Sequence, residues 1–167
     1  NCAARGLDIT NGKVEGVITE HGTIKTNRVL CAAGAWASAF CRHHGISFPQ
    51  ASVRQTAFRT KPIKSIGDAV YTNGVALTRR LDGTYTVAIS GTARLEFTPQ
   101  GIRYAKEFMP MFMQRIKAVQ FGVSSSFFKG PEALNSWTND GISPFEQIRI
   151  LDPAPVKSNL RKTLATV

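Results

Sequence analysis

Val29-Leu30-Cys31-Ala32-Ala33-Gly34-Ala35-Trp36 is the most informative run of this chain, since an apolar segment leads directly into a turn of small residues. Its apolar first half predicts a buried strand over residues 29–33, and the small residues that follow predict a tight turn into a helix. Such a turn lets backbone N–H groups approach a ligand, and a helix N-terminus favours an anion. Taken alone, tight packing of a strand against a helix is the commoner reason for such a run.

The residues before this run predict a small antiparallel sheet. A strand is expected over residues 2–7. Residues 14–19 and 23–26 have the composition of two further strands, and His21-Gly22 marks the turn between them. The three strands together predict a hairpin-based sheet at the start of the chain.

The residues after the run predict a short helix that closes the first domain. The helix is expected over residues 36–44, and Gly45 suits the left-handed C-cap position. Phe48-Pro49 interrupts regular structure after it. A domain boundary is therefore expected within residues 46–52.

The middle of the chain predicts a second antiparallel sheet. Residues 53–59 alternate loosely, as a half-buried strand does, and two further strands are expected over residues 68–78 and 84–90. Asp82-Gly83 predicts a hairpin turn between them, because both residues tolerate positive φ.

Thr98-Pro99 predicts the start of a long helix, with Thr as N-cap and Pro at the first helical position. The helix is expected to continue through Val119 and to bend at Pro110. One face is apolar, which predicts core packing against the sheet. The residues of that face are Ala105, Phe108, Met109, Phe112, Ile116 and Val119.

The last part of the chain predicts loops and a final helix. Residues 121–129 are rich in Ser, Gly and Phe and predict a loop or an irregular edge. Gly130-Pro131-Glu132 and Asn139-Asp140-Gly141 are turn signals on either side of Trp137, for which we expect a structural role. A helical pattern is present over residues 157–164.

Residues 16–30, followed by Ala32-Ala33-Gly34-Ala35-Trp36, form a predicted hairpin that leads into an A-x-G-x-W pattern. This arrangement resembles the D-amino acid oxidase-like family of FAD-dependent oxidoreductases, which includes glycine and sarcosine oxidases and D-amino acid dehydrogenases. The resemblance extends over nearly the whole chain, although its first segment alone is family-specific. The later stretches that fit are Val53-Arg54-Gln55, Arg79-Arg80-Leu81-Asp82-Gly83-Thr84-Tyr85 and Leu151-Asp152-Pro153-Ala154-Pro155.

The resemblance implies an α+β fold: a mainly antiparallel substrate-domain sheet with covering helices, plus a partial FAD-domain segment of hairpin, strand and helix. It assigns residues 1–49 to the FAD-binding domain, 50–150 to the substrate-binding domain and 151–167 to a helical segment leading back toward the FAD domain. The chain contains no G-x-G-x-x-G phosphate turn, and the family's C-terminal strand and helix would follow residue 167. We therefore expect an internal fragment of a longer enzyme, inactive alone and not retaining FAD.

The resemblance also implies a reaction, namely oxidation of the C–N bond of an amino acid or related amine by hydride transfer to FAD. No catalytic side chain is expected, because the flavin supplies the chemistry. Gln55 and Tyr85 are the implied substrate-binding residues. The Tyr common in amino acid oxidases has no counterpart at Val75-Ala76-Leu77, so the amino acid substrate rests on analogy. The implied cofactor-binding residues are Ala4, Ala32, Ala33, Gly34, Ala35 and Trp36.

The three cysteines, Cys2, Cys31 and Cys41, are too few for a disulfide framework, and we expect buried free thiols. Cys41 with His43 and His44 could suggest a metal. Adjacent histidines near a helix end project in different directions, however, and no second ligand pair completes a site. We therefore expect no metal.

The net charge of +10 raises nucleic-acid binding as a function, but the cations are spread singly or in pairs. They lack the interleaved aromatic residues of a single-strand-binding platform, so we expect no nucleic-acid partner. The alternatives to a flavoenzyme fragment are a self-standing basic interaction module without activity and a degenerate pseudo-enzyme. No apolar run is long enough for a membrane span. We expect a cytoplasmic location and leave peripheral membrane association, oligomeric state and electron acceptor open.

Overall fold

The computed structural model describes residues 2–90, 93–149 and 155–166. The chain divides into two compact units. Unit 1 comprises Asn1–Ser52, Phe97–Phe108 and Val123–Leu151, and unit 2 comprises Val53–Glu96, Met109–Gly122 and Asp152–Val167. The mixture of helices and largely antiparallel sheets confirms the α+β class. The domain limits implied by the resemblance stay a prediction.

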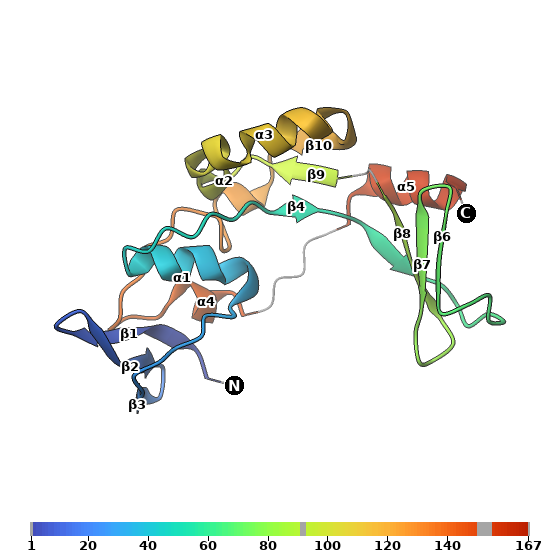
Figure 1. Ribbon diagram of the computed structural model, residues 1–167. Helices are drawn as coiled ribbons and strands as arrows, with labels where there is room; N and C mark the ends of the chain where they lie inside the picture. The colour runs from blue at the N-terminus through green and yellow to red at the C-terminus, as the bar shows by residue number, and fades with distance from the viewer. Residues whose placement is uncertain (1, 91–92, 150–154, 167) are drawn as a thin grey trace. The chain divides into compact units, whose positions relative to one another are not determined.

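Unit 1 contains a three-stranded antiparallel sheet in the order β1-β2-β3 (Figure 1). Its strands are β1 (Ala4–Thr10), β2 (Lys13–Thr19) and β3 (Gly22–Lys25). The predicted hairpin is confirmed, whereas the first strand begins and ends later than predicted. Asn11 and Gly12 connect β1 to β2 with φ of 52° and 74°, the left-handed pair of a two-residue hairpin turn.

The predicted strand over residues 29–33 is wrong, because the segment has no regular secondary structure. Within the described residues, the sheet of unit 1 ends at β3 and no strand pairs with this segment. An extended run is a strand only when a neighbour completes its hydrogen bonds. Leu30, which we expected to be buried, is 90% exposed.

The predicted short helix after the run is confirmed. It comprises the 3-10 turn η1 (Gly34–Trp36) and α1 (Ala37–His43). Gly45 ends it with φ of 72°, as predicted. Its N–H donates to Arg42 O at 3.0 Å and the next N–H, of Ile46, donates to Cys41 O at 2.9 Å, the two bonds of a Schellman motif.

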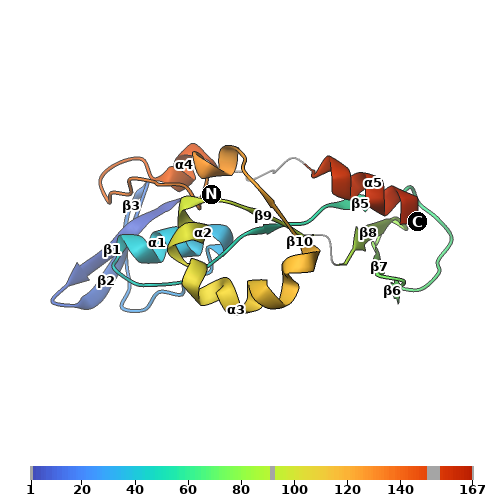
Figure 2. The ribbon, with the colours of Figure 1, turned by 90° about the horizontal axis from the view of Figure 1, so that it is seen from above.

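A second short helix of unit 1, α4 (Pro144–Gln147), lies beside the β1-β2-β3 sheet, as does α1 (Figures 1 and 2). Ser143 and Glu146 form a capping box at its start. Arg5 in β1 donates to Glu146 through Nε at 3.1 Å and Nη2 at 2.9 Å. These bonds lower the pKa of Glu146 from 4.5 to about 2, with bonds from Ser143 adding to the effect. The ion pair therefore fastens α4 to the sheet.

Unit 2 is built on a four-stranded antiparallel sheet in the order β5-β8-β7-β6, which confirms the predicted second sheet. A core of Val75, Tyr85 and Val87 lies on it. The helix α5 lies beside this sheet (Figures 1 and 2), and the N–H of Val156 just before it donates to Thr56 Oγ1 at 3.0 Å. The elements are β5 (Ala57–Arg59), β6 (Ala69–Thr72), β7 (Val75–Arg79), β8 (Tyr85–Ile89) and α5 (Lys157–Thr166), which confirms the predicted final helix.

Two strand predictions in this unit need correction. The single strand over residues 68–78 is two strands, because Asn73 and Gly74 turn the chain with φ of 47° and 79°. Residues 53–59 likewise form two strands, β4 (Val53–Arg54) and β5, since β4 pairs with β9 (Ala93–Glu96) and β5 pairs with β8. The first pair of strands is thus separated by a hairpin turn, and the second by a change of pairing partner.

The hairpin turn at Asp82-Gly83 is confirmed, but one of its two stated reasons is wrong. Gly83 has φ of 76°, whereas Asp82 keeps a negative φ. Asp82 contributes through its carboxylate, which accepts a hydrogen bond from the Thr84 N–H at 3.0 Å. Hydrogen bonds from the Thr84 side chain and backbone lower the pKa of Asp82.

The long predicted helix is interrupted at Tyr104, and the bend at Pro110 stays a prediction. It consists of α2 (Pro99–Arg103), α3 (Ala105–Arg115, which contains Pro110) and the 3-10 turn η2 (Ile116–Ala118). Its start is confirmed, since Thr98 Oγ1 accepts from Gly101 N at 3.0 Å. Val119 already belongs to β10 (Val119–Gly122), which pairs in parallel with β9.

Two further predictions concern this part of the chain, and the second is wrong. Residues 121–129, predicted as a loop or irregular edge, contain both, because residues 121–122 complete the edge strand β10 and the 3-10 turn η3 (Ser125–Phe127) follows. The apolar face of the helix is not core, since α3 has no buried side chain in the described structure and Met109 and Ile116 are 48% and 51% exposed. An amphipathic pattern shows that a face can be covered, and burial requires an element that covers it.

The stretch Leu151-Asp152-Pro153-Ala154-Pro155 lies almost entirely outside the described residues. Among the helices in residues 2–90, 93–149 and 155–166, none has the length and apolar character needed to cross a membrane.

Candidate functional site

The turn over residues 32–35 is exposed on unit 1 and has a backbone shape suited to an anion. Ala33 has φ of −83° and ψ of 13°, close to the right-handed helical region, and Gly34 has φ of 54° in the left-handed region. Successive residues of these two hands turn their N–H groups toward a common side, the arrangement called a nest. No side chain caps η1. The turn therefore offers backbone donors to a ligand.

Gly34 has open space where a side chain would project. A Cβ added there would meet no described atom within 4 Å. The positive φ of Gly34 by itself favours glycine at this position. The open space in addition leaves room for another molecule to approach the backbone, as a binding turn requires.

Gln50 fixes the shape of this turn, although no local pattern in the sequence indicates such a role. Its Oε1 accepts from Ser38 N at 2.9 Å, and its Nε2 donates to Gly34 O at 3.1 Å. One side chain therefore holds both ends of the segment from Gly34 to the first turn of α1. The backbone oxygen of Gln50 in turn accepts from Gln100 Nε2 at 3.3 Å.

Trp36 anchors the turn in an aromatic cluster within unit 1. It is 5% exposed and meets Trp137 and Phe145 edge to face, with ring centroids 6.2 Å and 5.9 Å apart. Trp137 also donates from Nε1 to Arg5 O at 2.5 Å, which agrees with its predicted structural role. Among the six cofactor-binding residues predicted from the sequence, Trp36 is buried, while the other five are exposed.

Ala4 lies apart from the turn in sequence, as the first residue of β1, where it pairs with Thr19. Its side chain is exposed. Its assignment to the cofactor stays a prediction.

The histidines of α1 and the cysteines are engaged or placed differently from expectation. His44 Nε2 accepts from Leu7 N at 3.0 Å, and burial, with His43 adding to the effect, lowers the pKa of His44. His43 Nε2 lies 2.7 Å from Asn139 Oδ1. Burial raises the pKa of the half-buried Cys41 thiol, and neighbouring Cys31 raises it further.

The expectation of buried thiols is therefore correct only in part for Cys41 and wrong for Cys2 and Cys31, which are exposed. Cys31 belongs to the segment that lacks a partner strand, which explains its exposure. Cys2 precedes the first strand of the sheet.

The two residues predicted to bind substrate have different surroundings in unit 2. Gln55 is exposed between β4 and β5. Tyr85 is fully buried, its hydroxyl donates to Gly67 O at 2.7 Å and accepts from Ile66 N at 3.0 Å. Both substrate roles stay predictions, and Tyr85 also has a clear role in the core of the sheet.

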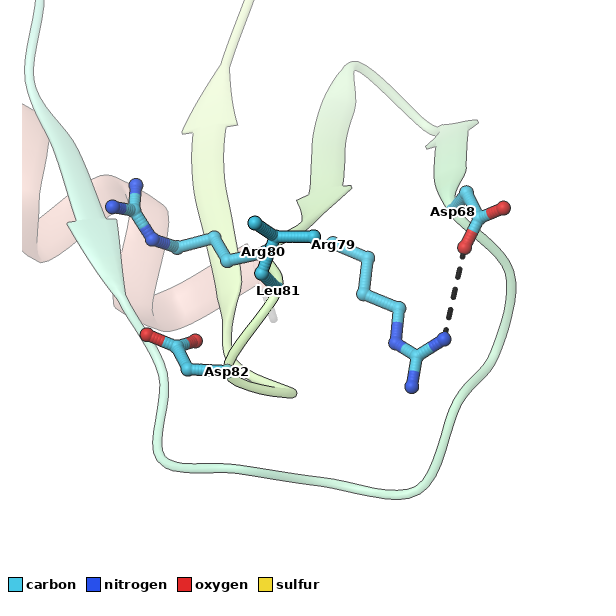
Figure 3. Close-up of a pocket in the computed structure, with 5 residues that line it drawn as sticks. All are labelled: Asp68, Arg79, Arg80, Leu81 and Asp82. Carbon is cyan, nitrogen blue, oxygen red and sulfur yellow. Dashed lines mark ion pairs between the residues drawn. The ribbon is translucent and has the colours of Figure 1, made fainter.

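A hollow of about 720 Å³ lies at the β7–β8 hairpin. Figure 3 shows that Arg79 points toward Asp68, 3.7 Å away between Nη1 and Oδ1, while Arg80 points to the opposite side. The two guanidinium groups therefore do not converge on one ligand. The residues that line the hollow are Asp68, Arg79, Arg80, Leu81 and Asp82.

The family to which the chain belongs follows from its match to a known protein family. A profile described as FAD dependent oxidoreductase matches residues 1–154. The chain belongs to this family. Membership confirms the resemblance found in the sequence and identifies FAD as the family's cofactor. This oxidoreductase chain has no match among curated proteins.

Solved structures similar to the oxidoreductase chain include two L-amino acid deaminases. The one from Proteus vulgaris has 26% identity and a TM-score of 0.80, and covers 99% of this chain and 39% of its own. The one from Proteus myxofaciens, in complex with anthranilate, has 27% identity and a TM-score of 0.84, and covers 99% and 37%. L-proline dehydrogenase from P. horikoshii has 25% identity and a TM-score of 0.50, and covers 68% and 34%. The chain thus spans about two fifths of the deaminases' length.

Proposed function

We propose that this chain supplies the substrate domain and part of the FAD domain of an enzyme that oxidises the C–N bond of an amino acid or related amine. The family match and the names of the similar deaminases and dehydrogenase support this reaction class. The observation that carries the proposal is the exposed Ala33-Gly34 nest with open space above Gly34.

The residues of the turn fit FAD, since backbone N–H groups without bulky side chains suit its anionic and polar groups. When bound, FAD accepts the hydride from the carbon next to the amine nitrogen. Ala32, Ala33, Gly34 and Ala35 would offer backbone to the cofactor, and Trp36 would hold the turn in the aromatic cluster. Ala4 would contact the cofactor through its backbone.

Gln50 is a positioning residue in this proposal. Its two hydrogen bonds keep Gly34 and Ser38 at a fixed separation, so the nest exists before a ligand arrives. Preorganised donors bind more tightly because no ordering cost is added on binding. In unit 2, the exposed amide of Gln55 would meet the substrate.

We propose further that the 167-residue chain alone neither turns over substrate nor retains FAD. It corresponds to less than two fifths of each of the two similar deaminases. It also contains no G-x-G-x-x-G phosphate turn.

The test is flavin binding by the protein encoded by the complete reading frame around this chain. Gly34→Val should weaken FAD binding at least tenfold, because its side chain fills the open space above the nest. Gly12→Val is the matched control: Gly12 also has positive φ, of 74°, and open space, but lies in the β1–β2 turn. Flavin absorbance per polypeptide after dialysis measures the effect.

Two results would contradict the proposal: a protein without flavin, or a Gly34→Val variant that binds FAD as tightly as the Gly12→Val control. Substrate class is tested on the flavin-loaded protein by release of ammonia from a panel of amino acids and simple amines. Gln55→Ala should raise KM without a matching change in kcat.

A further inference from the structure

Three metal-ligating side chains gather at the end of β2 in unit 1. Cys2 Sγ, a carboxylate oxygen of Glu20 and a ring nitrogen of His21 all lie within 4.8 Å of one another. Thiolate, carboxylate and imidazole are the ligand types of zinc sites. We propose that Cys2, Glu20 and His21 bind a divalent transition-metal ion of the zinc class, with a fourth position open to water or another ligand.

Hydrogen bonds fix the backbone that carries these ligands. Ala3 N donates to Glu20 Oε1 at 2.8 Å, and Glu20 N donates to Ala3 O at 3.1 Å. The segment next to Cys2 is therefore tied directly to the turn that holds the other two ligands. Ala3 itself is 1% exposed, so this attachment is part of the packed structure.

The turn after β2 is fixed in the same way. Thr19 Oγ1 donates to Gly22 O at 2.6 Å and accepts from His21 N at 3.2 Å. The three ligands thus stand on a constrained backbone, although they come from two segments of the chain. A site of this kind loses less conformational entropy on binding an ion than three ligands on flexible loops would.

The charges around Glu20 leave one of its oxygens available. Arg149 Nη2 donates to Oε2 at 2.5 Å, which favours the ionised carboxylate. Oε1 faces His21, whose Nε2 lies 3.9 Å away. A carboxylate oxygen has two lone pairs, and the N–H of Ala3 uses one on Oε1, so the other can bind an ion. The positive charge of Arg149 opposes the ion, and the thiolate that Cys2 forms on binding offsets this opposition.

The ligand atoms need a small adjustment to reach coordination geometry. A tetrahedral zinc ion with bonds of about 2.0–2.3 Å places its donor atoms roughly 3.3–3.8 Å apart. Cys2 is exposed and the His21 side chain is 70% exposed, so both can rotate inward by the ~1 Å required without disturbing the core. Calcium and magnesium prefer oxygen ligands, so the mixed donor set selects against them.

This site is separate from the residues that the sequence suggested. The residues that suggested a metal in the sequence are Cys41, His43 and His44, for which we expected none. In the structure those histidines are engaged with Asn139 and Leu7, whereas the cluster at Cys2 depends on hairpin geometry that brings the turn after β2 back to the start of β1.

The test is zinc binding by the untagged chain, kept reduced with a phosphine and titrated in competition with a chromogenic chelator. We expect one Zn²⁺ per chain, and a loss of affinity of at least tenfold in Cys2→Ser and in His21→Ala. Cys31→Ser is the matched control, because Cys31 is also exposed but lies outside the cluster. Circular dichroism checks that each variant is folded.

Cobalt gives a second readout. Co²⁺ should produce a thiolate-to-metal absorption band in the parent chain and in Cys31→Ser, and the band should be absent in Cys2→Ser. The site is overturned if the parent binds no zinc beyond the Cys2→Ser/His21→Ala double variant, or if the band persists without Cys2. No flavin takes part, so the outcome is independent of the proposed oxidoreductase function.

Discussion

The four-stranded sheet of unit 2 and the segment over residues 29–33 of unit 1 are both apolar in sequence, yet they differ in burial. In the sheet, Val75, Tyr85 and Val87 are 5%, 0% and 0% exposed, because each strand finds its partners within the chain. In the segment, Leu30 is 90% exposed. An apolar run therefore becomes part of a core only when neighbouring elements cover it.

Replacement of Tyr85 should change the free energy of unfolding more than any other substitution proposed below. Tyr85→Ala removes a fully buried ring and leaves Ile66 N and Gly67 O without their partner, so we expect a loss of roughly 4 kcal/mol in the free energy of unfolding. Urea denaturation measures it. Tyr71→Ala on β6, at the edge of the same sheet, is the control, since Tyr71 is 68% exposed and its replacement should cost far less. Equal losses would mean that the sheet has no self-contained core.

The Arg5–Glu146 ion pair tests how much an electrostatic contact, as opposed to a buried side chain, stabilises unit 1. Glu146→Gln should lower stability at neutral pH by about 2 kcal/mol, because the native carboxylate is stabilised by Arg5 and Ser143. Its pKa is depressed from 4.5 to about 2, so this stabilisation is complete above pH 4.5 and is lost as the pH falls toward 2. Denaturation of both proteins across this range should show their stabilities converge. A constant difference would argue against the ion pair.

The turn glycines test whether the two sheets share the same local chemistry. Gly74 in unit 2 and Gly12 in unit 1 have φ of 79° and 74°. Gly74→Ala and Gly12→Ala should each cost about 1 kcal/mol, because alanine is strained at positive φ. Hydrogen exchange of the flanking strands locates the loss. If only one substitution is costly, the hairpins do not contribute equally to their units.

Replacement of Leu30 should have the smallest effect. Leu30→Ala in the 167-residue chain should change the free energy of unfolding by less than about 0.5 kcal/mol, as expected for an exposed side chain. A buried strand residue would instead cost about 2–5 kcal/mol. A loss in that range, measured by urea denaturation, would restore the original prediction of a buried strand.

Local signals predicted much of the fold, and long-range contacts account for what they missed. The helix end predicted at Gly45 and the helix start predicted at Thr98 are correct, because helix ends depend on a few adjacent residues. The Asn73-Gly74 turn has an equally strong local signal, which the prediction of a single strand over residues 68–78 overlooks. The strand predicted over residues 29–33 is wrong because a strand forms only beside a partner strand, which the local sequence does not identify.

The candidate site shows the same division. The small residues of the turn were visible in sequence, whereas Gln50 was not, since its bonds to Gly34 and Ser38 join residues 16 and 12 positions away. The cluster of Cys2, Glu20 and His21 was missed for a similar reason. Cys2 comes close to Glu20 and His21 only when β1 pairs with β2.

The aromatic cluster also provides an intrinsic fluorescence probe of unit 1. The chain has two tryptophans, Trp36 and Trp137, and their rings lie 6.2 Å apart within unit 1. Intrinsic tryptophan emission therefore reports on unit 1 alone, because unit 2 contains no tryptophan. Because Trp36 directly follows the turn assigned to the cofactor, a flavin bound there would quench this emission by energy transfer, and one optical signal would report both the melting of unit 1 and the arrival of its ligand.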